Sequence, residues 1–339
     1  MNLVQKISFL NHNKDLFDSK NEEKMWWFFR EQFRFGHREI LLDYLNLDYS
    51  NLILGFMQHG VHPHQRVGFW PFQELPISMS KLYPVFTWSR EEKSLEIGEK
   101  NHVVAIGAPW LYLLHTLGMF SSGTFKIVST NQVVKDLLVV PSHGSGHYYP
   151  RANYVDSVKN FRQSIGDVDA SVLLYYTEFC DRAVRQAWMN QGFALECSGL
   201  AWGAENRTVW TYNGGRTQFL LNTLNAIIRH REVICLAPTS LATYSASLGV
   251  PTSIQIYEGI SQNLGVVNKG KGVNRLKQYD ANLVDYAKKL LGPDYSDRAI
   301  SQSKIELSKR YLGIEYFRTK DELRDLLPIR HGLVPVPNN

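Results

Sequence analysis

Residues 136–147 have the sequence DLLVVPSHGSGH, an apolar run that opens onto a loop of Ser, His and Gly. From there to Tyr257 the chain alternates apolar, strand-like runs with runs of helical periodicity. The predicted strands are Leu137–Pro141, Ser171–Tyr176, Phe193–Cys197, Val233–Leu236 and Thr252–Tyr257. The predicted helices are Tyr154–Ile165, Arg182–Asn190, Thr217–His230 and Leu241–Leu248. This alternation predicts a parallel, doubly wound α/β sheet, which binds ligands at the carboxyl ends of its strands.

Length and composition set the limits for the rest of the chain. Its 339 residues are 44% hydrophobic and 12% aromatic, which indicates two domains with buried cores and argues against disorder. The net charge of +5 suits an anionic small molecule or surface. That charge is too small to indicate nucleic acid as a partner.

The cysteines and the hydropathy pattern indicate a cytoplasmic protein. Cys180, Cys197 and Cys235 form no CxxC pair, so we interpret them as reduced packing residues rather than a disulfide or metal set. No basic segment precedes an apolar run of the kind found in signal peptides. No apolar run reaches the roughly 20 residues that span a bilayer.

The first 125 or so residues predict a smaller α/β unit. Its strands are expected at Asn51–Met57, Val85–Trp88 and Val103–Ile106. Glu22–Tyr44 predicts an aromatic-rich amphipathic helix, which we interpret as buried in its own domain, with membrane insertion as the alternative. Residues 119–135 are interpreted as the linker. Further helices are predicted in the tail, at Ala281–Leu291, Ile300–Leu312 and Lys320–Leu326.

Thr239 and Ser240 are candidate phosphate ligands. They stand between a predicted buried strand and a predicted helix, where free N–H groups and the positive end of the helix dipole favour an anion. The alternative is a plain helix N-cap.

His143, Ser145 and His147 are candidate nucleotide-binding residues in the loop after the first strand of the second domain. The glycines between them let backbone approach a ligand closely, and imidazole donates well to phosphate. Two His without a clear third ligand argue against a metal site. The loop matches neither a Walker sequence nor a dinucleotide fingerprint, which argues against ATP hydrolysis and NAD chemistry.

Three residues are candidates for general acid or base catalysis. Glu178 follows the second predicted strand of the second domain, where a carboxylate can accept from a sugar hydroxyl or move a proton. Its neighbour Asp181 is interpreted as the cap of a helix beginning at Arg182. In the first domain, His59 belongs to a cluster of three His within six residues at a strand end. Glu91 or Glu92 could do the same work, with a solvated helix start at Arg90–Lys93 as the alternative interpretation.

Two α/β domains with strand-end loops facing one another resemble the layout of GT-B glycosyltransferases. Within residues 50–260 the chain also resembles a group of bacterial surface-polysaccharide transferases. The similar segments are Ser142–His147, Gly192-Phe193 with Cys197-Ser198-Gly199, Phe219–Ile228, Thr239–Pro251 and Ile106–Tyr112.

This resemblance implies a GT-B fold, in which two Rossmann-like domains face each other across a cleft and a C-terminal helical tail follows. Residues 1–125 would be the acceptor-side domain, residues 126–300 the nucleotide-sugar domain, and residues 301–339 a tail that packs back on the first domain. Some relatives use CMP-activated sialic, pseudaminic or Kdo sugars, and a paired Ser/Thr motif holds the donor phosphate. Thr239-Ser240 matches that motif.

The expected function is transfer of a nonulosonic or ulosonic acid from a CMP donor to a glycan or lipid-linked glycan of the bacterial surface. The reaction is expected to need no metal and no cofactor, because helix N-termini and His or Lys can neutralise the leaving phosphate. The enzyme would work in the cytoplasm, at the inner face of the membrane with peripheral contact. Two alternatives stay open: a nucleotide-sugar 2-epimerase of the same fold, and a non-catalytic component of a polysaccharide assembly complex.

Overall fold

The computed structural model of the chain describes residues 32, 34–49, 51–58, 60–61, 83–90, 103–126, 135–141, 154–199, 218–257 and 283–331. The chain divides into two compact units. Unit 1 comprises residues 1–123, 202–217 and 312–339, and unit 2 comprises residues 124–201 and 218–311. The tail predicted for residues 301–339 is therefore divided between the units at residue 312.

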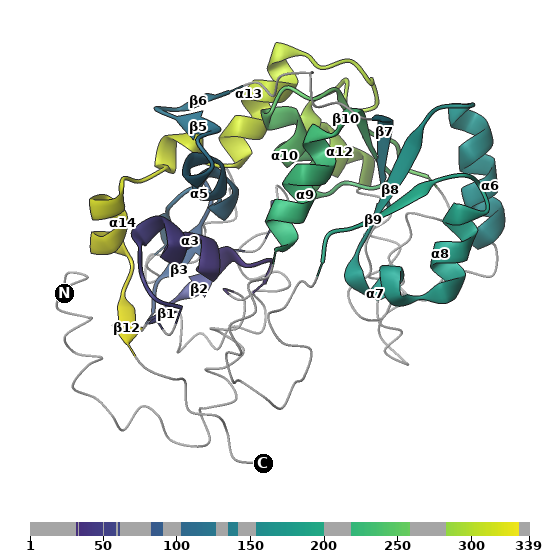
Figure 1. Cartoon of the computed structure of the whole chain (residues 1–339). Coiled ribbons are helices and arrows are strands. Elements are labelled where there is room, and N and C mark those ends of the chain that lie inside the picture. Colours follow the sequence, from purple (N-terminus) through teal and green to yellow (C-terminus); the bar gives the residue numbers. More distant parts are fainter. Residues whose placement is uncertain are drawn as a thin grey trace, which may run out of the picture. The chain divides into compact units, whose positions relative to one another are not determined.

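Unit 2 is built on a five-stranded sheet in which each neighbouring pair of strands is parallel. Its strands lie in the order β9-β8-β7-β10-β11 (Figure 1). Their bounds are Lys135–Val140 for β7, Ala170–Leu174 for β8, Ala194–Cys197 for β9, His230–Cys235 for β10 and Thr252–Ile254 for β11. The prediction of an α/β fold with a parallel sheet is confirmed.

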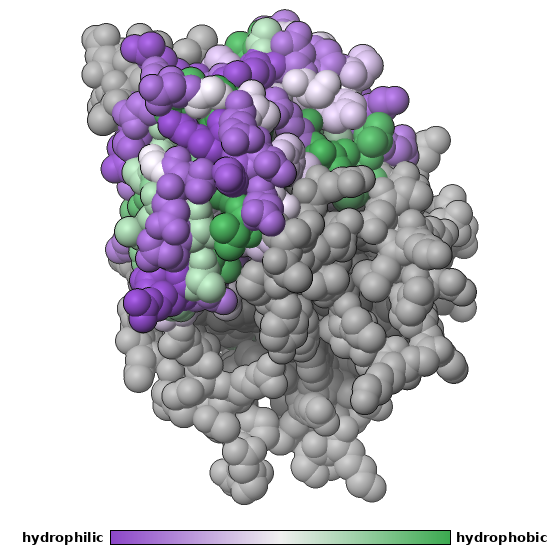
Figure 2. Space-filling model, turned by 90° about the vertical axis from the view of Figure 1, so that its right-hand side faces the viewer, coloured by the Kyte–Doolittle hydropathy of each residue, from purple (hydrophilic) through white to green (hydrophobic). Residues whose placement is uncertain are grey.

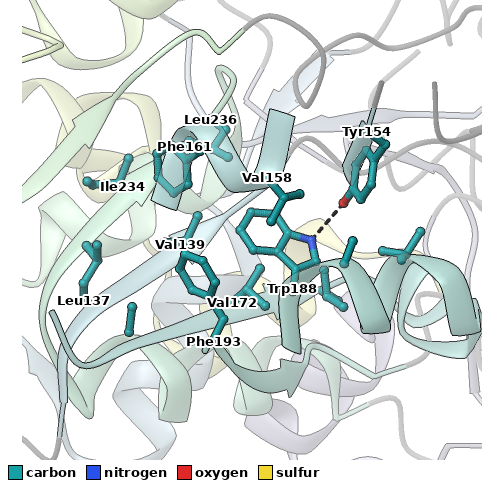
Figure 3. Close-up of a cluster of buried hydrophobic side chains, with 14 residues drawn as sticks. Leu137, Val139, Tyr154, Val158, Phe161, Val172, Trp188, Phe193, Ile234 and Leu236 are labelled. Atoms are coloured by element: carbon teal, nitrogen blue, oxygen red, sulfur yellow. Dashed lines mark hydrogen bonds between the residues drawn. The ribbon is translucent and has the colours of Figure 1, made fainter. Parts of the chain in front are cut away.

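One face of this sheet packs against α6 (Tyr154–Ile165) and α8 (Arg182–Met189), which lie on the same side of it (Figure 1). Every second residue of a strand faces this core, because side chains alternate along a strand. The ring nitrogen of the fully buried Trp188 donates to the Tyr154 hydroxyl over 2.8 Å (Figure 3). This bond satisfies the indole N–H, so the largest side chain of the core is buried without an unpaired donor.

The other face of the sheet is covered by α9 (Phe219–Ile228) and α10 (Ser240–Ser247). Two later helices, α12 (Leu283–Leu291) and α13 (Gln302–Tyr311), pack in turn against α10. As a result α10 is buried on all its sides, although it consists largely of Ser, Thr and Ala. Small side chains allow this helix to be enclosed between the sheet and a further layer of helices.

Lys304 of α13 is a fully buried lysine in unit 2. Its ammonium group donates to the carbonyl oxygens of Thr252, Asp297 and Ala299 over 3.3, 2.6 and 3.0 Å. Burial lowers the pKa of Lys304, and the nearby carboxylates of Asp294 and Asp297 act in the opposite direction. Three acceptors match the three donors of an ammonium group, so the side chain fastens the segment before α13 to β11.

The described residues of unit 1 form two small sheets. The first has the parallel order β2-β3-β4, with β2 at Phe56–Met57, β3 at Val85–Thr87 and β4 at Val103–Ala105. The second pairs β1 (Asn51–Ile53) antiparallel with β12 (Ile329–His331). A short hairpin of β5 (Phe120–Ser121) and β6 (Thr124–Phe125) begins the segment predicted as the linker.

The single strand predicted at Asn51–Met57 is wrong, because the chain changes sheets in the middle of it. The change falls next to Gly55, where a Cβ atom would lie 2.4 Å from the Phe86 ring and 2.9 Å from the Pro84 carbonyl oxygen. Only glycine fits between these neighbours. The apolar run looks continuous in the sequence because both halves are buried.

The helix predicted at Glu22–Tyr44 is also not continuous. Helix α3 begins at His37 and ends at Leu45, and Phe35 and Gly36 before it have φ angles of 56° and 73°. Such positive φ angles stop a right-handed helix. The aromatic residues between 22 and 31 lie outside the described part of the chain.

The core of unit 1 joins α3, α5 (Pro109–Thr116) and α14 (Lys320–Leu326) to the strands. The part of unit 1 that follows unit 2 in sequence, from residue 312 onward, is called the returning chain. It is held there by Phe317, whose ring packs against those of Tyr44 and Tyr112. The Arg318 backbone adds two hydrogen bonds: its carbonyl accepts from the Tyr44 hydroxyl over 2.9 Å, and its N–H donates to the Tyr112 hydroxyl over 3.1 Å. Burial raises the pKa of both tyrosines, so both hydroxyls stay protonated at neutral pH.

The surface of unit 2 over α6 and α8 is polar. Figure 2 looks at the side that carries these helices, and its described part is mainly hydrophilic. Exposed charged residues such as Asp156 and Lys159 alternate on α6 with the buried Val158 and Phe161. No helix within the described ranges is long and apolar enough to cross a membrane.

Candidate functional site

The strand order of unit 2 changes direction between β7 and β10. From β7 the chain builds outward through β8 and β9, and it then returns to the other side of β7 to form β10 and β11. Val140 pairs with Cys235 at the carboxyl end, and the Leu236 N–H donates to the Val140 carbonyl over 2.8 Å. Such a change of direction is called a switch point. Open α/β sheets bind ligands there, outside the carboxyl ends of the strands.

Thr239 and Ser240 stand where the chain leaves β10 for α10. Thr239 is the N-cap, and its hydroxyl oxygen accepts from the Leu241 N–H over 3.4 Å. The N-cap alternative raised from the sequence is therefore realised for Thr239. A hydroxyl that accepts one bond keeps its proton for donation, so this cap remains compatible with an anion at the start of α10. Phosphate binding by the pair stays a prediction.

His143, Ser145 and His147 lie outside the described residues, and the structure describes only where their loop begins. β7 ends at Val140, and Pro141 is the last described residue before the loop. The loop therefore leaves the sheet at the β7 end of the switch point, next to the strand that leads to Thr239. Its role in donor binding stays a prediction.

Glu178 belongs to a short helix, α7 (Tyr176–Cys180), which the sequence did not predict. The side chain is buried, with 5% of its area exposed, and its carboxylate accepts from the Tyr175 N–H over 3.0 Å. This bond holds the start of α7. A catalytic role for Glu178 is a prediction that this capping bond neither requires nor excludes.

Asp181 was interpreted as a helix cap, and this is confirmed. Its carboxylate accepts from the N–H groups of Ala183 and Val184 over 2.8 and 3.2 Å, and α8 begins at Arg182. The signal was local, because an Asp directly before a helical run supplies the acceptor that the first N–H groups lack.

All three cysteines are free thiols, but only some of them are packing residues. Cys235 is fully buried in β10, and burial raises the pKa of its thiol. Burial also raises the pKa of Cys197, which is partly covered. Cys180 is exposed, so the prediction that it packs in a core is wrong.

An Asp-x-Asp triplet, a motif that can hold a metal, occurs at Asp167-Val168-Asp169. It directly precedes β8, at the amino ends of the strands and opposite the switch point. Asp167 lies 3.4 Å from the Arg162 guanidinium and Asp169 lies 3.3 Å from the Lys135 ammonium. Among the described residues, no group of three or more His, Cys, Asp and Glu is placed to hold a metal ion.

In unit 1 the candidates His59 and Glu91 lie outside the described residues, but the strand ends beside them are described. The Trp88 carbonyl accepts from the Gly107 N–H over 3.0 Å, and the Leu312 carbonyl accepts from the Ala108 N–H over 2.8 Å. Gly313 lies so close that a Cβ on it would be 1.8 Å from the Trp88 carbonyl oxygen. The returning chain therefore packs directly on the ends of β3 and β4.

Sequence reasoning did not single out His37 at this edge. His37 is fully buried at the start of α3, and its ring meets the Trp88 ring edge-on at 5.8 Å. Because Glu22–Tyr44 was interpreted as one helix, His37 looked like one polar residue among many and was not selected. The preceding Gly36 and the acidic Glu39 in the first turn were the local signals of a helix start there.

Comparison with known proteins adds no relative: no family model matches the chain, and neither a curated protein nor a solved structure is significantly similar to it.

Proposed function

We propose that the chain is a metal-independent glycosyltransferase of the GT-B type. It would transfer a nonulosonic or ulosonic acid from a CMP donor to a glycan or lipid-linked glycan acceptor of a bacterial surface polysaccharide. Unit 2 would bind the nucleotide sugar, and unit 1 would bind the acceptor.

The observation that carries the proposal is the strand order of unit 2. The order β9-β8-β7-β10-β11 corresponds to 3-2-1-4-5 in chain order, which is the order of nucleotide-binding sheets. Both segments chosen from the sequence as donor ligands leave the two strands that flank the change of direction. Thr239-Ser240 follows β10, and the loop with His143, Ser145 and His147 follows β7.

The organisation of unit 1 supports a two-domain transferase. Unit 1 has its own parallel sheet, β2-β3-β4, and it also contains the chain from residue 312 onward. Such a unit supplies a second set of strand-end loops, with His59 and Glu91 next to the ends of β2 and β3.

The proposed chemistry divides between the two sets of loops. The N-terminus of α10 and the imidazoles of His143 and His147 stabilise the leaving phosphate, which gains charge as the glycosidic bond breaks. The acceptor hydroxyl attacks the anomeric carbon, and His59 takes its proton, because an imidazole is a suitable base near neutral pH. Glu91 and Glu178 are the alternative bases.

A nucleotide panel followed by a transfer assay tests the proposal. CMP, UDP, GDP and dTDP are compared by thermal shift, where a ligand at 100 times its dissociation constant stabilises by about 2.7 kcal/mol. Transfer from a CMP-sugar to an acceptor glycan, unchanged by EDTA, is expected. A new nucleotide sugar formed without acceptor would instead indicate the epimerase. No shift with any nucleotide would indicate the non-catalytic component.

A further inference from the structure

Cys180 and Cys197 belong to the same edge of the unit 2 sheet. Cys197 is the last residue of β9, and its partner in the strand pair is Leu174, the last residue of β8. The Ser198 N–H donates to the Leu174 carbonyl over 3.1 Å, which continues the pairing beyond the strands. From Leu174 the chain passes almost directly into α7, whose last residue is Cys180. Both thiols therefore follow the carboxyl ends of adjacent strands.

The two thiols also belong to the same face of the sheet. Leu195 packs against the core that α6 and α8 form on one face, and residues two apart in a strand share a face, so Cys197 points to this side. α7 lies beside α8 (Figure 1). Phe179, next to Cys180 in α7, packs against the same core. The segment that carries Cys180 and the side chain of Cys197 are thus on one side of the sheet.

Different surroundings give the two thiols different accessibility. Cys180 is exposed, whereas Cys197 is partly covered, and the Gly199 N–H donates to the Cys197 sulfur over 3.3 Å. Burial raises the pKa of the Cys197 thiol, the Gly199 bond opposes this increase, and charge on Cys180 and Glu178 adds to it. Charge effects fall with distance, so this influence agrees with the placement of Cys180 beside Cys197. A reagent from solvent reaches Cys180 first.

We propose that Cys180 and Cys197 form a reversible dithiol site that reacts with low-molecular-weight disulfides, of which glutathione disulfide is the probe. The Cys180 thiolate attacks one sulfur of the reagent, which gives a mixed disulfide at Cys180 and releases one glutathione thiolate. The Cys197 thiolate then attacks the Cys180 sulfur, forms the bond between the two residues and expels the second glutathione thiolate. The protein loses two protons and two electrons, and the electrons reduce glutathione disulfide to two thiols. This site is independent of the proposed glycosyl transfer.

The dimensions of α7 suit closure of this bond. A disulfide joins Cα atoms about 4.4–6.8 Å apart. α7 has five residues, so at about 1.5 Å per residue its end lies within about 8 Å of its start, which adjoins the strand partner of Cys197. A helix of one turn reorients at low cost, because it has few backbone bonds to lose. The closed bond ties the end of α7 to the end of β9 and encloses α8 in one covalent loop.

Cys235 is the matched control within the chain. It is fully buried in β10. Its neighbours Ile234 and Leu236 face the core formed with α6 and α8, so Cys235 points to the other face of the sheet. Cys235→Ser is therefore expected to leave the reaction of the other two thiols unchanged. Cys197→Ser instead removes the second attacking thiol and leaves the exposed Cys180 in place.

The experiment incubates the native full chain with glutathione disulfide, stops the exchange with acid and determines masses under non-reducing conditions. Wild type and Cys235→Ser are expected to lose two hydrogen atoms, to yield a linked peptide pair that contains Cys180 and Cys197, and to keep no glutathione. Cys197→Ser is expected to keep one glutathione, on Cys180. Dithiothreitol should restore the original mass in every case.

The wild-type protein alone can overturn the proposal. Glutathione that stays on Cys180 although Cys197 is present would show that the second attack does not occur. A bond to Cys235, a bond between two chains or an unmodified protein would overturn it as well. Closure is expected to be faster at higher pH, because the thiolate is the attacking species, and a rate of closure that does not rise with pH would contradict the exchange mechanism.

Discussion

The carboxyl edges of the two parallel sheets are built in different ways. In unit 1 the strand ends are held by side chains from neighbouring strands and by a segment that is distant in sequence. Gln58 is bonded to Trp88, and Gly313 packs on the Trp88 carbonyl. In unit 2 the described part of the edge is held by ladder bonds and by local helix caps, as at Thr239 and Asp181. The first edge is fixed by side chains and backbone from distant parts of the chain, and the second by strand pairing together with local helix caps.

The difference teaches where each unit is sensitive to substitution. A locally capped edge loses about one hydrogen bond when a cap is removed, and the rest of the fold is unaffected. An edge made by long-range packing fails when one contact is lost, because each member supports the next. The substitutions below test this contrast in order of decreasing effect.

Gly313→Ala is expected to have the largest effect, a loss of more than about 4 kcal/mol of stability or failure of unit 1 to fold. The new Cβ would lie 1.8 Å from the Trp88 carbonyl oxygen, and φ at this position is +70°. Gly118→Ala is the control, because Gly118 has φ +68° with nothing within 4 Å. It is expected to cost about 1–2 kcal/mol, the cost of left-handed backbone alone. Equal losses in urea unfolding would show that the contact with Trp88 is unimportant.

Lys304→Met is expected to cost about 3 kcal/mol in unit 2, because three backbone carbonyl groups lose a charged donor and the side chain that joins them is buried. The comparison variant Lys309→Met removes an ion pair with Glu306, whose side chain is 53% exposed, and is expected to change stability by less than about 1 kcal/mol. Both are measured by chemical denaturation. Nucleotide affinity should survive in folded Lys304→Met, since the buried ammonium contacts only Thr252, Asp297 and Ala299 among the bonds described. A loss of affinity would place Lys304 in the donor site.

Thr239→Ala and Ser240→Ala test the local edge of unit 2. Each is expected to weaken CMP binding by about 0.5–1.5 kcal/mol, and more where the partner is a charged phosphate, while the protein stays folded. Calorimetry measures the affinity, and thermal unfolding of the apo protein measures the cap. Unchanged affinity with a lower melting temperature for Thr239→Ala would identify a helix cap and nothing more.

His230 gives the smallest effect, a pH dependence at the amino end of β10, away from the switch point. Burial lowers its pKa; Nδ1 lies 2.7 Å from the Ala226 carbonyl oxygen and Nε2 lies 3.7 Å from a Glu196 carboxylate oxygen. The unfolded chain therefore binds a proton more readily, and stability is expected to fall as pH drops below about 6.5 toward the folded-state pKa. The contribution of His230 to the slope of the unfolding free energy against pH cannot exceed the value for one proton, about 1.4 kcal/mol per pH unit.

His230→Asn should remove this part of the pH dependence, measured as the difference in unfolding free energy between pH 7.5 and pH 5.5. The contributions that raise the pKa are the Ala226 bond and the Glu196 carboxylate, and Arg229 and Lys135 lower it further. A variant with the same pH slope as wild type would show that other groups, such as carboxylates, carry it. CMP affinity should be unaffected by this substitution, because His230 lies at the opposite end of the strand from Thr239.

Much of unit 2 was predictable because its signals are local. Helix α6 has the predicted bounds Tyr154–Ile165, and α8 begins at the residue after the predicted cap Asp181. Periodicity of the apolar residues and the capping acceptor act within one or two turns of helix, so the sequence displays them directly. The local pattern did not reveal α7, because a one-turn helix is too short to show a period.

Unit 1 was less predictable because its boundaries depend on contacts between distant residues. The break between β1 and β2 comes from the Phe86 ring and the Pro84 carbonyl at Gly55, and the start of α3 comes from positive φ at Phe35 and Gly36. Neither is visible in an apolar run. The sequence also pointed to His59 and Glu91, but not to Gln58, whose partners Trp88 and Gly60 are specified only by folding.

By itself the sequence determined the α/β class, the order of the strands and of the longer helices in unit 2, and the caps Asp181 and Thr239, because these depend on hydrophobic period and on acceptors next to helix starts. Only the tertiary structure decided that β10 pairs with β7, so that the chain changes direction between them and brings the starts of the two candidate donor loops together. It also decided that Gly313 closes on Trp88 across more than two hundred residues. Strand pairing and such contacts minimise exposed apolar area over the whole chain, and no local window of sequence contains that sum.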